Sequence, residues 1–516
     1  MSSGDDWSTS SNDALLLTLV SPSPSGPKTI GHSFHPKFTY SIFGDSEEIF
    51  GYRDLEINLQ YNASDLRPNL TISYSKKFPT VGETEATDIE GVLREFLPDV
   101  AFQKKSDFET AIKNVGADWT PPGKLCARFT TKESNFEVWK ANLADPAVKQ
   151  LVKRIQILVP LFIEGGTPID VDTPDADRWT IFFLYEKKAA SDDGSTPYVF
   201  AGYSTVYRFF VMLPKGSLTT SPSEEVVEQA AQSQDFDLSQ LPCRTRISQF
   251  IILPTFQGRG LGPRLYYHIY QNYLLHPQTV EITVEDPNEA FDDMRDVADL
   301  HFLRTMNDFR ALRINTELTI PKHGPAPDNI VDKAAWEATR AKAKMAPRQF
   351  ARVLEMDLMS RLPEAVRPGI EVPEGEEEAA ATNGKGKGKA PVRPRQTPEQ
   401  EHEYRLWRLL LKVRLYKHNK DALGELELPE RIAKLDETVA SVEFDYARLL
   451  LKAEEQFQRM SAEGVEASNA AAAALAPVAA IGSTVKNGKR KAEENGEEAP
   501  VVSKKVRVES VSDEEA

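Results

Sequence analysis

The sequence predicts an α+β protein built on a mixed β-sheet, with helices gathered in the C-terminal third. Two runs rich in β-branched and aromatic residues, 179–186 and 198–213, are typical of strands. A strand, a glycine loop, a helix and a second strand follow within 246–284. From about residue 291 the spacing of apolar residues becomes helical, so the last third of the chain is predicted to be helical.

Composition limits the class of protein. The chain has 516 residues, of which 40% are hydrophobic and 27% are charged, and it contains only 2 Cys. These values exclude a disulfide-stapled secreted scaffold, a collagen and a wholly disordered chain. The two thiols form neither a metal cluster nor a CxxC pair, so we expect an intracellular protein without a metal site. The apolar run 14–20 lacks a basic flank and is too short to span a membrane.

The charge favours a basic partner. The 62 Lys and Arg residues against 78 Asp and Glu residues give a formal net charge of −16, which argues against nonspecific DNA binding. Acidic residues cluster at 45–48, 170–177 and 285–286, and these three clusters could line one groove.

The length exceeds the usual limit of a single core, so several domains are expected. We predict an N-terminal mixed α+β domain, a second α+β domain that holds the glycine loop, a helical domain with a disordered insert at 363–398, and a disordered tail. Their bounds are 1–165, 166–310, 311–460 and 461–516.

Local patterns place the elements in order. Short β-rich runs such as 71–74 and a helical pattern at 147–159 make up the first region. A Ser/Glu/Gln-rich stretch at 214–242 lacks periodicity and predicts an inserted surface loop. The elements predicted beyond it are strand 246–253, helix 263–275, strand 280–284, and helices 291–306, 330–344, 348–361, 399–420 and 430–457.

The most informative stretch is ISQFIILPTFQGRGLGPRLYYHIYQNYLL at 247–275, in which an apolar strand runs into Gly258, Gly260 and Gly262 and then into a helix. Such a turn presents backbone N–H groups at a helix N-terminus, where a phosphate or pyrophosphate is favoured. Pro263 suits the first helical turn but donates no N–H group.

Three interpretations of this loop compete with a turn that binds nothing. A Walker A loop needs a Lys that is absent here. A dinucleotide fingerprint needs Gly at position 263, although Glu281 has the spacing that this motif expects. The pattern [QR]xxGxG/A fits at Gln257, Gly260 and Gly262, and it resembles the acetyl-coenzyme A loop of the GNAT acetyltransferases.

A closer resemblance extends over residues 12–310. Its motifs are FGDSEEIFGY (43–52), IDVDTPDADRW (169–179), GYSTVYRFF (202–210), LPTFQGRGLG (253–262) and EITVEDPNEAF (281–291), which together resemble the type B histone acetyltransferase catalytic subunits. The resemblance implies a GNAT fold with a splayed central sheet. It also implies transfer of acetyl from acetyl-coenzyme A to lysines in the N-terminal tail of newly made histone H4, presented together with histone H3, beside a WD-repeat histone-binding subunit.

Acetyl transfer to lysine requires a base. A lysine amine with a pKa near 10.4 is neutral in only about one molecule in 2,500 at pH 7, equivalent to roughly 4.6 kcal/mol against nucleophilic attack. Glu285 ends the strand 280–284 and could accept the proton, provided that burial beside Asp286 raises its pKa. The resemblance assigns the base to Glu285, with Asp286 as the second choice; a turn residue is the simpler interpretation of Asp286.

The resemblance also assigns the binding residues. The coenzyme contacts it implies are Phe250, Ile251 and Ile252 on the splayed strand, Gln257, Gly258, Arg259, Gly260, Leu261, Gly262 and Pro263 in the loop, and Asn288. A backbone N–H near Ile252 is the natural donor to an oxyanion. The histone-peptide contacts it implies are Asp45, Ser46, Glu47, Trp179, Tyr207, Arg208 and Phe209. A capped turn, a core tryptophan and a buried strand are the alternatives for these peptide residues.

The tail carries two basic patches, KNGKRK at 486–491 and SKKVRVE at 503–509. They resemble a bipartite nuclear import signal, so we expect a protein shared between cytoplasm and nucleus, although a solvated basic run is an alternative. Two other functions stay open from the residues alone. The acidic groove could serve a non-catalytic histone chaperone, and the loop could serve an enzyme that uses a nicotinamide dinucleotide.

Overall fold

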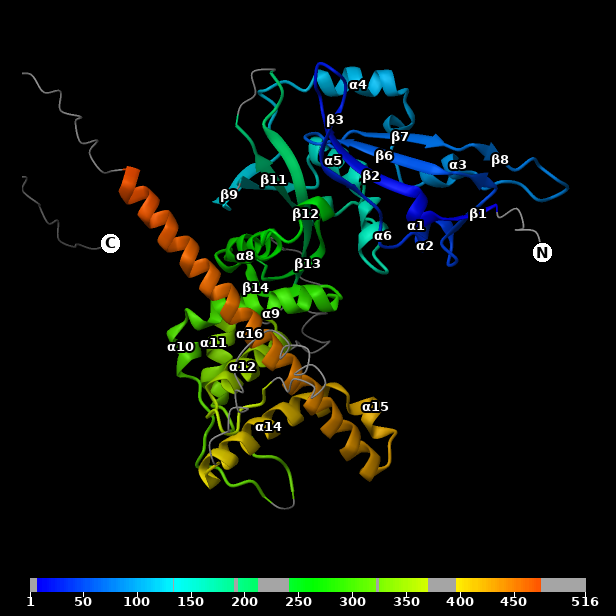
Figure 1. The fold of residues 1–516 in the computed structure, drawn as a ribbon. Coiled ribbons are helices and arrows are strands. Elements are labelled where there is room, and N and C mark those ends of the chain that lie inside the picture. The colour runs from blue at the N-terminus through cyan, green and yellow to red at the C-terminus, as the bar shows by residue number, and fades with distance from the viewer. Residues whose placement is uncertain are drawn as a thin grey trace, which may run out of the picture. The chain divides into compact units, whose positions relative to one another are not determined.

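The computed structural model describes residues 7–132, 134–189, 194–211, 241–321, 324–369 and 396–474. Most of the predicted loop at 214–242 and of the predicted insert at 363–398 lies outside these residues. Residues 1–460 form one compact unit, and residues 461–516 form a second unit whose described part is helical. The mixed α+β class predicted from the sequence is confirmed (Figure 1).

The N-terminal region is built on a four-stranded sheet with the order β3-β2-β6-β7, in which only β2 and β6 run parallel. The apolar run at 14–20, which could have been a strand or a helix, forms β2. The strands of this region are β1 (Ser8–Ser10), β2 (Leu15–Ser21), β3 (Lys28–Phe34), β4 (Glu48–Phe50), β5 (Tyr52–Arg53), β6 (Glu56–Asn62), β7 (Pro68–Ser73) and β8 (Lys76–Lys77). Its helices are α1 (Ser11–Ala14), α2 (Tyr40–Phe43), α3 (Ile89–Arg94), α4 (Lys105–Lys113), α5 (Pro146–Ile155) and α6 (Leu158–Phe162).

The helical pattern predicted at 147–159 forms two separate helices, α5 and α6. Pro160 lies four residues after Gln156 and has no N–H group to donate to its carbonyl, so a continuous helix is interrupted at this point. The Gln156 carbonyl instead accepts from the Val159 N–H at 3.0 Å.

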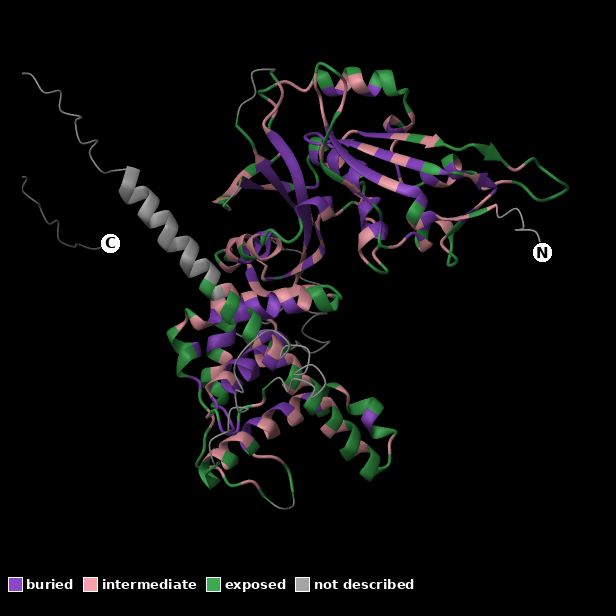
Figure 2. Ribbon diagram, viewed as in Figure 1, coloured by how far each residue is buried: buried purple, intermediate pink, exposed green. Residues whose placement is uncertain are grey.

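A six-stranded sheet with the order β14-β13-β12-β11-β10-β9 forms the centre of the molecule. Neighbouring strands are antiparallel except for β13 and β14, which are parallel. Its strands are β9 (Lys124–Thr130), β10 (Asn135–Asn142), β11 (Trp179–Lys187), β12 (Tyr198–Phe210), β13 (Cys243–Ile252) and β14 (Thr279–Val284). The sheet therefore includes two strands from before the domain boundary predicted at residue 165. Figure 2 shows that β11 and β12 are buried along most of their length.

Helices follow in the second half of the chain. They are α8 (Leu261–Leu274), α9 (Glu289–Arg304), α10 (Asn307–Ala311), α11 (Lys333–Ala343), α12 (Pro347–Arg361), α14 (Pro398–His418), α15 (Lys420–Gly424) and α16 (Leu428–Ala474). α16 extends to Ala474, into the tail that the sequence predicts to begin at residue 461, and residues 475–516 lie outside the described part.

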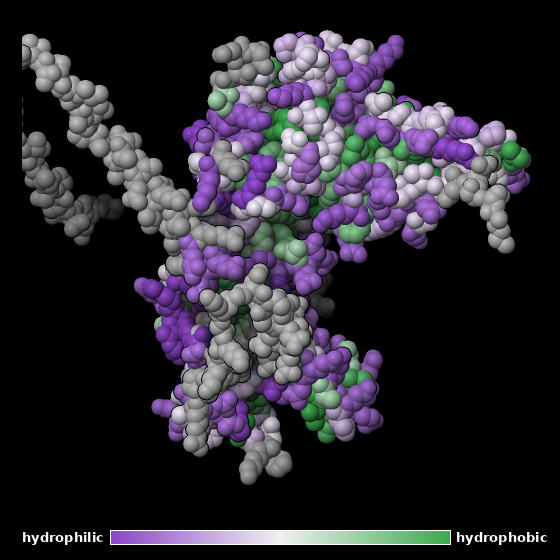
Figure 3. All heavy atoms as spheres, viewed as in Figure 1, coloured by the Kyte–Doolittle hydropathy of each residue, from purple (hydrophilic) through white to green (hydrophobic). Residues whose placement is uncertain are grey.

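The hydrophobic core runs continuously from β2 through the six-stranded sheet to α12, α14 and α16. Hydrophilic residues cover most of the face in Figure 3, whereas hydrophobic residues show over α15 and the start of α16. Leu428 and Ile432 are 63% and 54% exposed there.

Candidate active site

The candidate site lies where β13 and β14 separate. The two strands are paired from Cys243, opposite Thr279, to Ile247, opposite Val284. The Glu285 backbone N–H then donates to the Ile247 carbonyl at 2.9 Å, and pairing ends there. Because β13 continues to its end paired with β12 alone, one edge of its last residues is open.

A β-bulge in β13 determines which backbone groups face this open edge. Between Ile247 and Phe250, three steps along β13 match two steps along β12. Beyond the bulge, the Leu253 N–H donates to the Ala201 carbonyl on the β12 side at 3.0 Å. Backbone groups alternate between the two sides of a strand, so the N–H groups of Phe250 and Ile252 face the open edge.

The glycine loop brings a helix N-terminus to the same place. Gly258 and Gly260 have φ values of 76° and 69°, in the left-handed region, and a Cβ atom on either would meet no atom within 4 Å. Glycine is therefore needed there for its backbone conformation rather than for space. Gly260 precedes α8, and no side chain of the described residues caps this helix, so the first-turn N–H groups are available to an anion.

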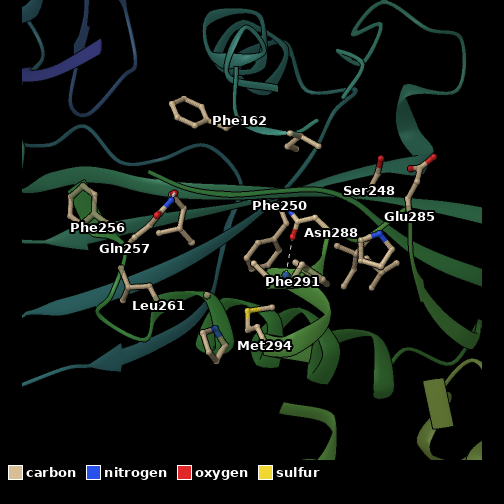
Figure 4. Close-up of a pocket in the computed structure, with 18 of the residues that line it drawn as sticks. Phe162, Ser248, Phe250, Phe256, Gln257, Leu261, Glu285, Asn288, Phe291 and Met294 are labelled. Carbon is tan, nitrogen blue, oxygen red and sulfur yellow. Dashed lines mark hydrogen bonds between the residues drawn. The ribbon is translucent and has the colours of Figure 1, made fainter. Parts of the chain in front are cut away.

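These elements enclose a cavity of about 420 Å³. Figure 4 shows Gln257 and Phe256 at one end of it, Ser248 and Glu285 at the other, and Phe250 between them. Eleven of the predicted catalytic and coenzyme residues line it, namely Phe250, Ile252, Gln257, Gly258, Gly260, Leu261, Gly262, Pro263, Glu285, Asp286 and Asn288.

Two residues predicted to contact the coenzyme, Ile251 and Arg259, are not among the described residues that line the cavity. The Ile251 side chain is 4% exposed and packs in the core, because it points to the opposite face of the strand from Phe250 and Ile252. The Arg259 guanidinium donates to the Thr255 carbonyl at 3.1 Å, and Arg259 is absent from the described residues that line the cavity.

Glu285 and Asp286 are accessible. The Glu285 side chain is 43% exposed, and its carboxylate lies 3.7 Å from the Arg246 guanidinium. The burial beside Asp286 that the sequence led us to expect is therefore not found. Asp286 has a φ of 32° in the turn after β14. Asn288 caps α9, since its Oδ1 accepts from the Phe291 N–H at 2.9 Å, and it also lines the cavity.

An aromatic row crosses the sheet toward Glu285. Trp179 lies opposite Tyr207, and Tyr207 lies opposite Arg246, so their side chains share one face. Ring centroids are 4.8 Å apart for Trp179 and Tyr207 and 4.6 Å apart for Tyr207 and Phe209. The Tyr207 hydroxyl donates to Asp175 at 2.5 Å; burial first, and this bond second, raise the pKa of Tyr207.

Arg208 does not join the aromatic row. Alternation along β12 directs its side chain to the other face from Tyr207 and Phe209, and its guanidinium donates to the Asp177 carbonyl at 3.1 Å. Of the three residues that the resemblance assigned to peptide contact on β12, Arg208 therefore lies on the opposite face of the sheet from Tyr207 and Phe209.

The acidic segment 45–47 lies outside the cavity lining. Asp45 and Ser46 are exposed. The Glu47 carboxylate accepts from the backbone N–H groups of Thr39 and Tyr40, at 2.6 and 3.1 Å, at the start of α2. The bond from Thr39 is the main cause that lowers the pKa of Glu47. Glu47 therefore caps the turn at the start of α2, which is the structural alternative to a peptide contact.

Known proteins resemble this chain along its whole length. Residues 7–164 match the model "Histone acetyl transferase HAT1 N-terminus", and residues 296–362 match "Fungal HAT1, C-terminal". The histone acetyltransferase type B catalytic subunit of Neurospora crassa is 55% identical over 99% of both chains. The chain belongs to the family of histone acetyltransferase type B catalytic subunits.

Two less similar members of the type B family match most of this chain. The subunit of Pyricularia oryzae is 50% identical over 89% of this chain and 94% of its own, and that of Aspergillus oryzae is 40% identical over 87% of each. Family membership favours the acetyltransferase interpretation of the glycine loop over the dinucleotide and chaperone alternatives.

Sequence reasoning missed one wall of the site in this type B family member. Lys37, Phe162 and Ile163, from the N-terminal region, line the cavity opposite α8 and α9. The Lys37 backbone N–H donates to the Leu161 carbonyl at 2.9 Å, which ties the Lys37 loop to the end of α6. The only local signal was an apolar run, LVPLFI at 158–163, which does not distinguish a cavity wall from core.

Among the described residues, no group of three or more His, Cys, Asp or Glu side chains could hold a metal ion. Across the same residues, no helix is both long and apolar enough to cross a membrane.

Proposed function

We propose that this chain transfers the acetyl group of acetyl-coenzyme A to lysine ε-amines in the N-terminal tail of newly synthesised histone H4. Its family supports histone acetylation by a protein lysine acyltransferase. Acetyl-coenzyme A is proposed as the acetyl donor because one continuous cavity has a helix N-terminus at one end and Glu285 at the other. The splayed pair β13 and β14 supports a GNAT arrangement of the sheet.

The cavity fits the chemistry of the donor. Backbone N–H groups from Gly258 to Gly262 suit a diphosphate, and the open edge of β13 suits an amide-rich arm. Bound acetyl-coenzyme A supplies an activated acyl thioester. The N–H groups of Phe250 and Ile252 can donate to an oxygen that gains negative charge during acyl transfer.

Glu285 accepts the proton in this proposal. Glu285 follows β14 beside the cavity and its carboxylate is open to water, so it can take the proton of the incoming ammonium directly or through a water molecule. Asp286 is the second choice for this role. The aromatic row of Trp179, Tyr207 and Phe209 offers ring faces to lysine side chains of the histone tail, and Asp175 supplies negative charge beside it.

Acetyl transfer to H4 and H3 tail peptides by wild type and by Glu285→Gln tests the proposal. We expect transfer to H4 and a fall in kcat of about 10²- to 10⁴-fold in the variant, with the KM for acetyl-coenzyme A kept. Glu289→Gln is the matched control, because Glu289 is an exposed carboxylate close to Glu285 in the sequence and is absent from the described cavity lining. Equal turnover of the two variants would remove Glu285 from the base role. If calorimetry finds affinity for a nicotinamide dinucleotide and none for acetyl-coenzyme A, the assignment of acetyl-coenzyme A as the acetyl donor is contradicted.

Partners and location belong to the same proposal. The expected partners are histone H4 with histone H3 and a WD-repeat histone-binding subunit, and the expected location is both cytoplasm and nucleus. The patches at 486–491 and 503–509 lie outside the described residues. Cytoplasmic retention of a fluorescently tagged chain truncated after residue 485 would support import through these patches, and unchanged nuclear entry would contradict it.

A further inference from the structure

Arg246 lies between the aromatic row and Glu285. It stands on β13, opposite Tyr207 of β12 and Thr283 of β14, and its side chain is 35% exposed. Its guanidinium carbon is 4.5 Å from the centroid of the Phe209 ring, and its Nη1 is 3.7 Å from Glu285 Oε1. One side chain thus contacts both the row and the carboxylate.

The contact matters because Glu285 has little else to hold it. Glu285 follows the last residue of β14, and the turn continues through the left-handed Asp286. Among the described residues, Arg246 is the only side chain within ion-pair distance of the Glu285 carboxylate. A planar guanidinium resting on an aromatic ring is restricted in orientation, so it restricts the carboxylate in turn.

We propose that Arg246 is a positioning residue that holds Glu285 at the end of the cavity and disfavours the charged form of the arriving lysine. This role rests on the proposed function. A lysine amine that reaches Glu285 comes next to the guanidinium, and a neighbouring positive charge favours the neutral amine, which is the nucleophile. The attraction between Arg246 and Glu285 also keeps the carboxylate at the end of the cavity.

Other charged residues lie on the same surface as Arg246. Those on the elements around Arg246 and Tyr207 are Lys37, Asp175, Arg178, Arg244, Glu281 and Asp286. Arg244 gives a matched control, because it lies two residues earlier on the same face of β13. Its guanidinium pairs with Glu281 at 2.8 Å, and it is absent from the described cavity lining.

The test compares wild type, Arg246→Gln, Arg246→Lys and Arg244→Gln as full-length chains, each checked for an unchanged circular dichroism spectrum. We measure kcat and KM for an H4 tail peptide and for acetyl-coenzyme A from pH 6 to 9. In R246Q we expect kcat at pH 7 to fall on the order of 10- to 100-fold, KM for acetyl-coenzyme A to stay constant, and the rise of kcat with pH to move to higher pH. R246K keeps the charge and should recover part of kcat, whereas R244Q should match wild type.

Two failures are distinguishable. If R246Q matches R244Q in kcat and in its pH profile while Glu285→Gln remains impaired, the role of Arg246 is wrong and the proposed function stands. If wild type acetylates the peptide and Glu285→Gln does so equally well, the base assignment fails and the role of Arg246 fails with it. A loss in R246Q confined to the peptide KM would assign Arg246 to peptide binding and overturn the positioning role.

Discussion

The left-handed conformation of Gly260 gives the most direct test of the coenzyme loop. Its φ and ψ are 69° and 21°, and a Cβ atom at this position would meet no atom within 4 Å. Gly260→Ala therefore introduces no clash, and its cost is the left-handed backbone itself, about 1–2 kcal/mol for an L-residue. If the free loop of the variant relaxes to other backbone angles, binding must restore the left-handed form. The Kd for coenzyme A should then rise about 5- to 30-fold.

A second glycine separates this effect from a general loss of stability. Gly82 has a φ of 62°, and a Cβ atom there would also meet no atom within 4 Å, but it is not among the described residues that line the cavity. Gly82→Ala introduces the same left-handed alanine away from the cavity and should leave the Kd for coenzyme A unchanged. Isothermal calorimetry with coenzyme A and thermal melts of both variants supply the measurements. A folded Gly260→Ala that binds coenzyme A as tightly as wild type would refute the reasoning.

Further predictions concern stability and acid–base behaviour. Glu47→Ala should lower the free energy of unfolding by about 1 kcal/mol because the start of α2 loses its acceptor, whereas Asp45→Ala should not; equal melting temperatures for the two variants would contradict the capping role. Burial raises the pKa of Asp299 from 3.8 to about 6. Between pH 4 and pH 6, the Asp299 carboxyl therefore binds more protons in the native state than in the unfolded state. The stability of wild type relative to Asp299→Asn should therefore fall as pH rises from 4 to 7, and denaturant unfolding at both pH values that gives a constant difference would oppose this.

The sequence predicted most elements because their apolar patterns are strong and local. The strand predicted at 179–186 forms β11, the helix predicted at 348–361 forms α12, and the loop motif from Gln257 to Gly262 takes its expected place between strand and helix. The left-handed backbone at Gly258 and Gly260 explains why glycine stands at these two positions. At the third position, Gly262, an added Cβ atom would lie 3.1 Å from the Met294 sulfur. The short motif predicts the position of the loop because the geometry of the loop depends on residues that are neighbours in the sequence.

Features that depend on register or on distant segments could not be predicted. The β-bulge between Ile247 and Phe250 requires knowledge of the β12 partner, and it decides which backbone groups face the cavity. Period-two alternation could have separated Arg208 from Tyr207 and Phe209, since neighbours in a strand point to opposite faces. By contrast, nothing local could show that Lys37 and Phe162 form the opposite wall, because that wall depends on how the N-terminal region packs.

The position of Glu285 also depends on the C-terminal helices. Met345, between α11 and α12, pairs with Ile282, and the Ile282 N–H donates to the Lys344 carbonyl at 2.7 Å. Arg340 fixes this segment, since its guanidinium donates to the Met345 carbonyl at 2.8 Å and lies 3.6 Å from Glu281. β14 is thereby held on both edges at its middle, while its end is free to part from β13. Because a strand held in this way directs the residue that follows it at a fixed angle, the segment from α11 to α12 helps to place the Glu285 carboxylate beside the cavity, although none of the described residues of this segment lines the cavity.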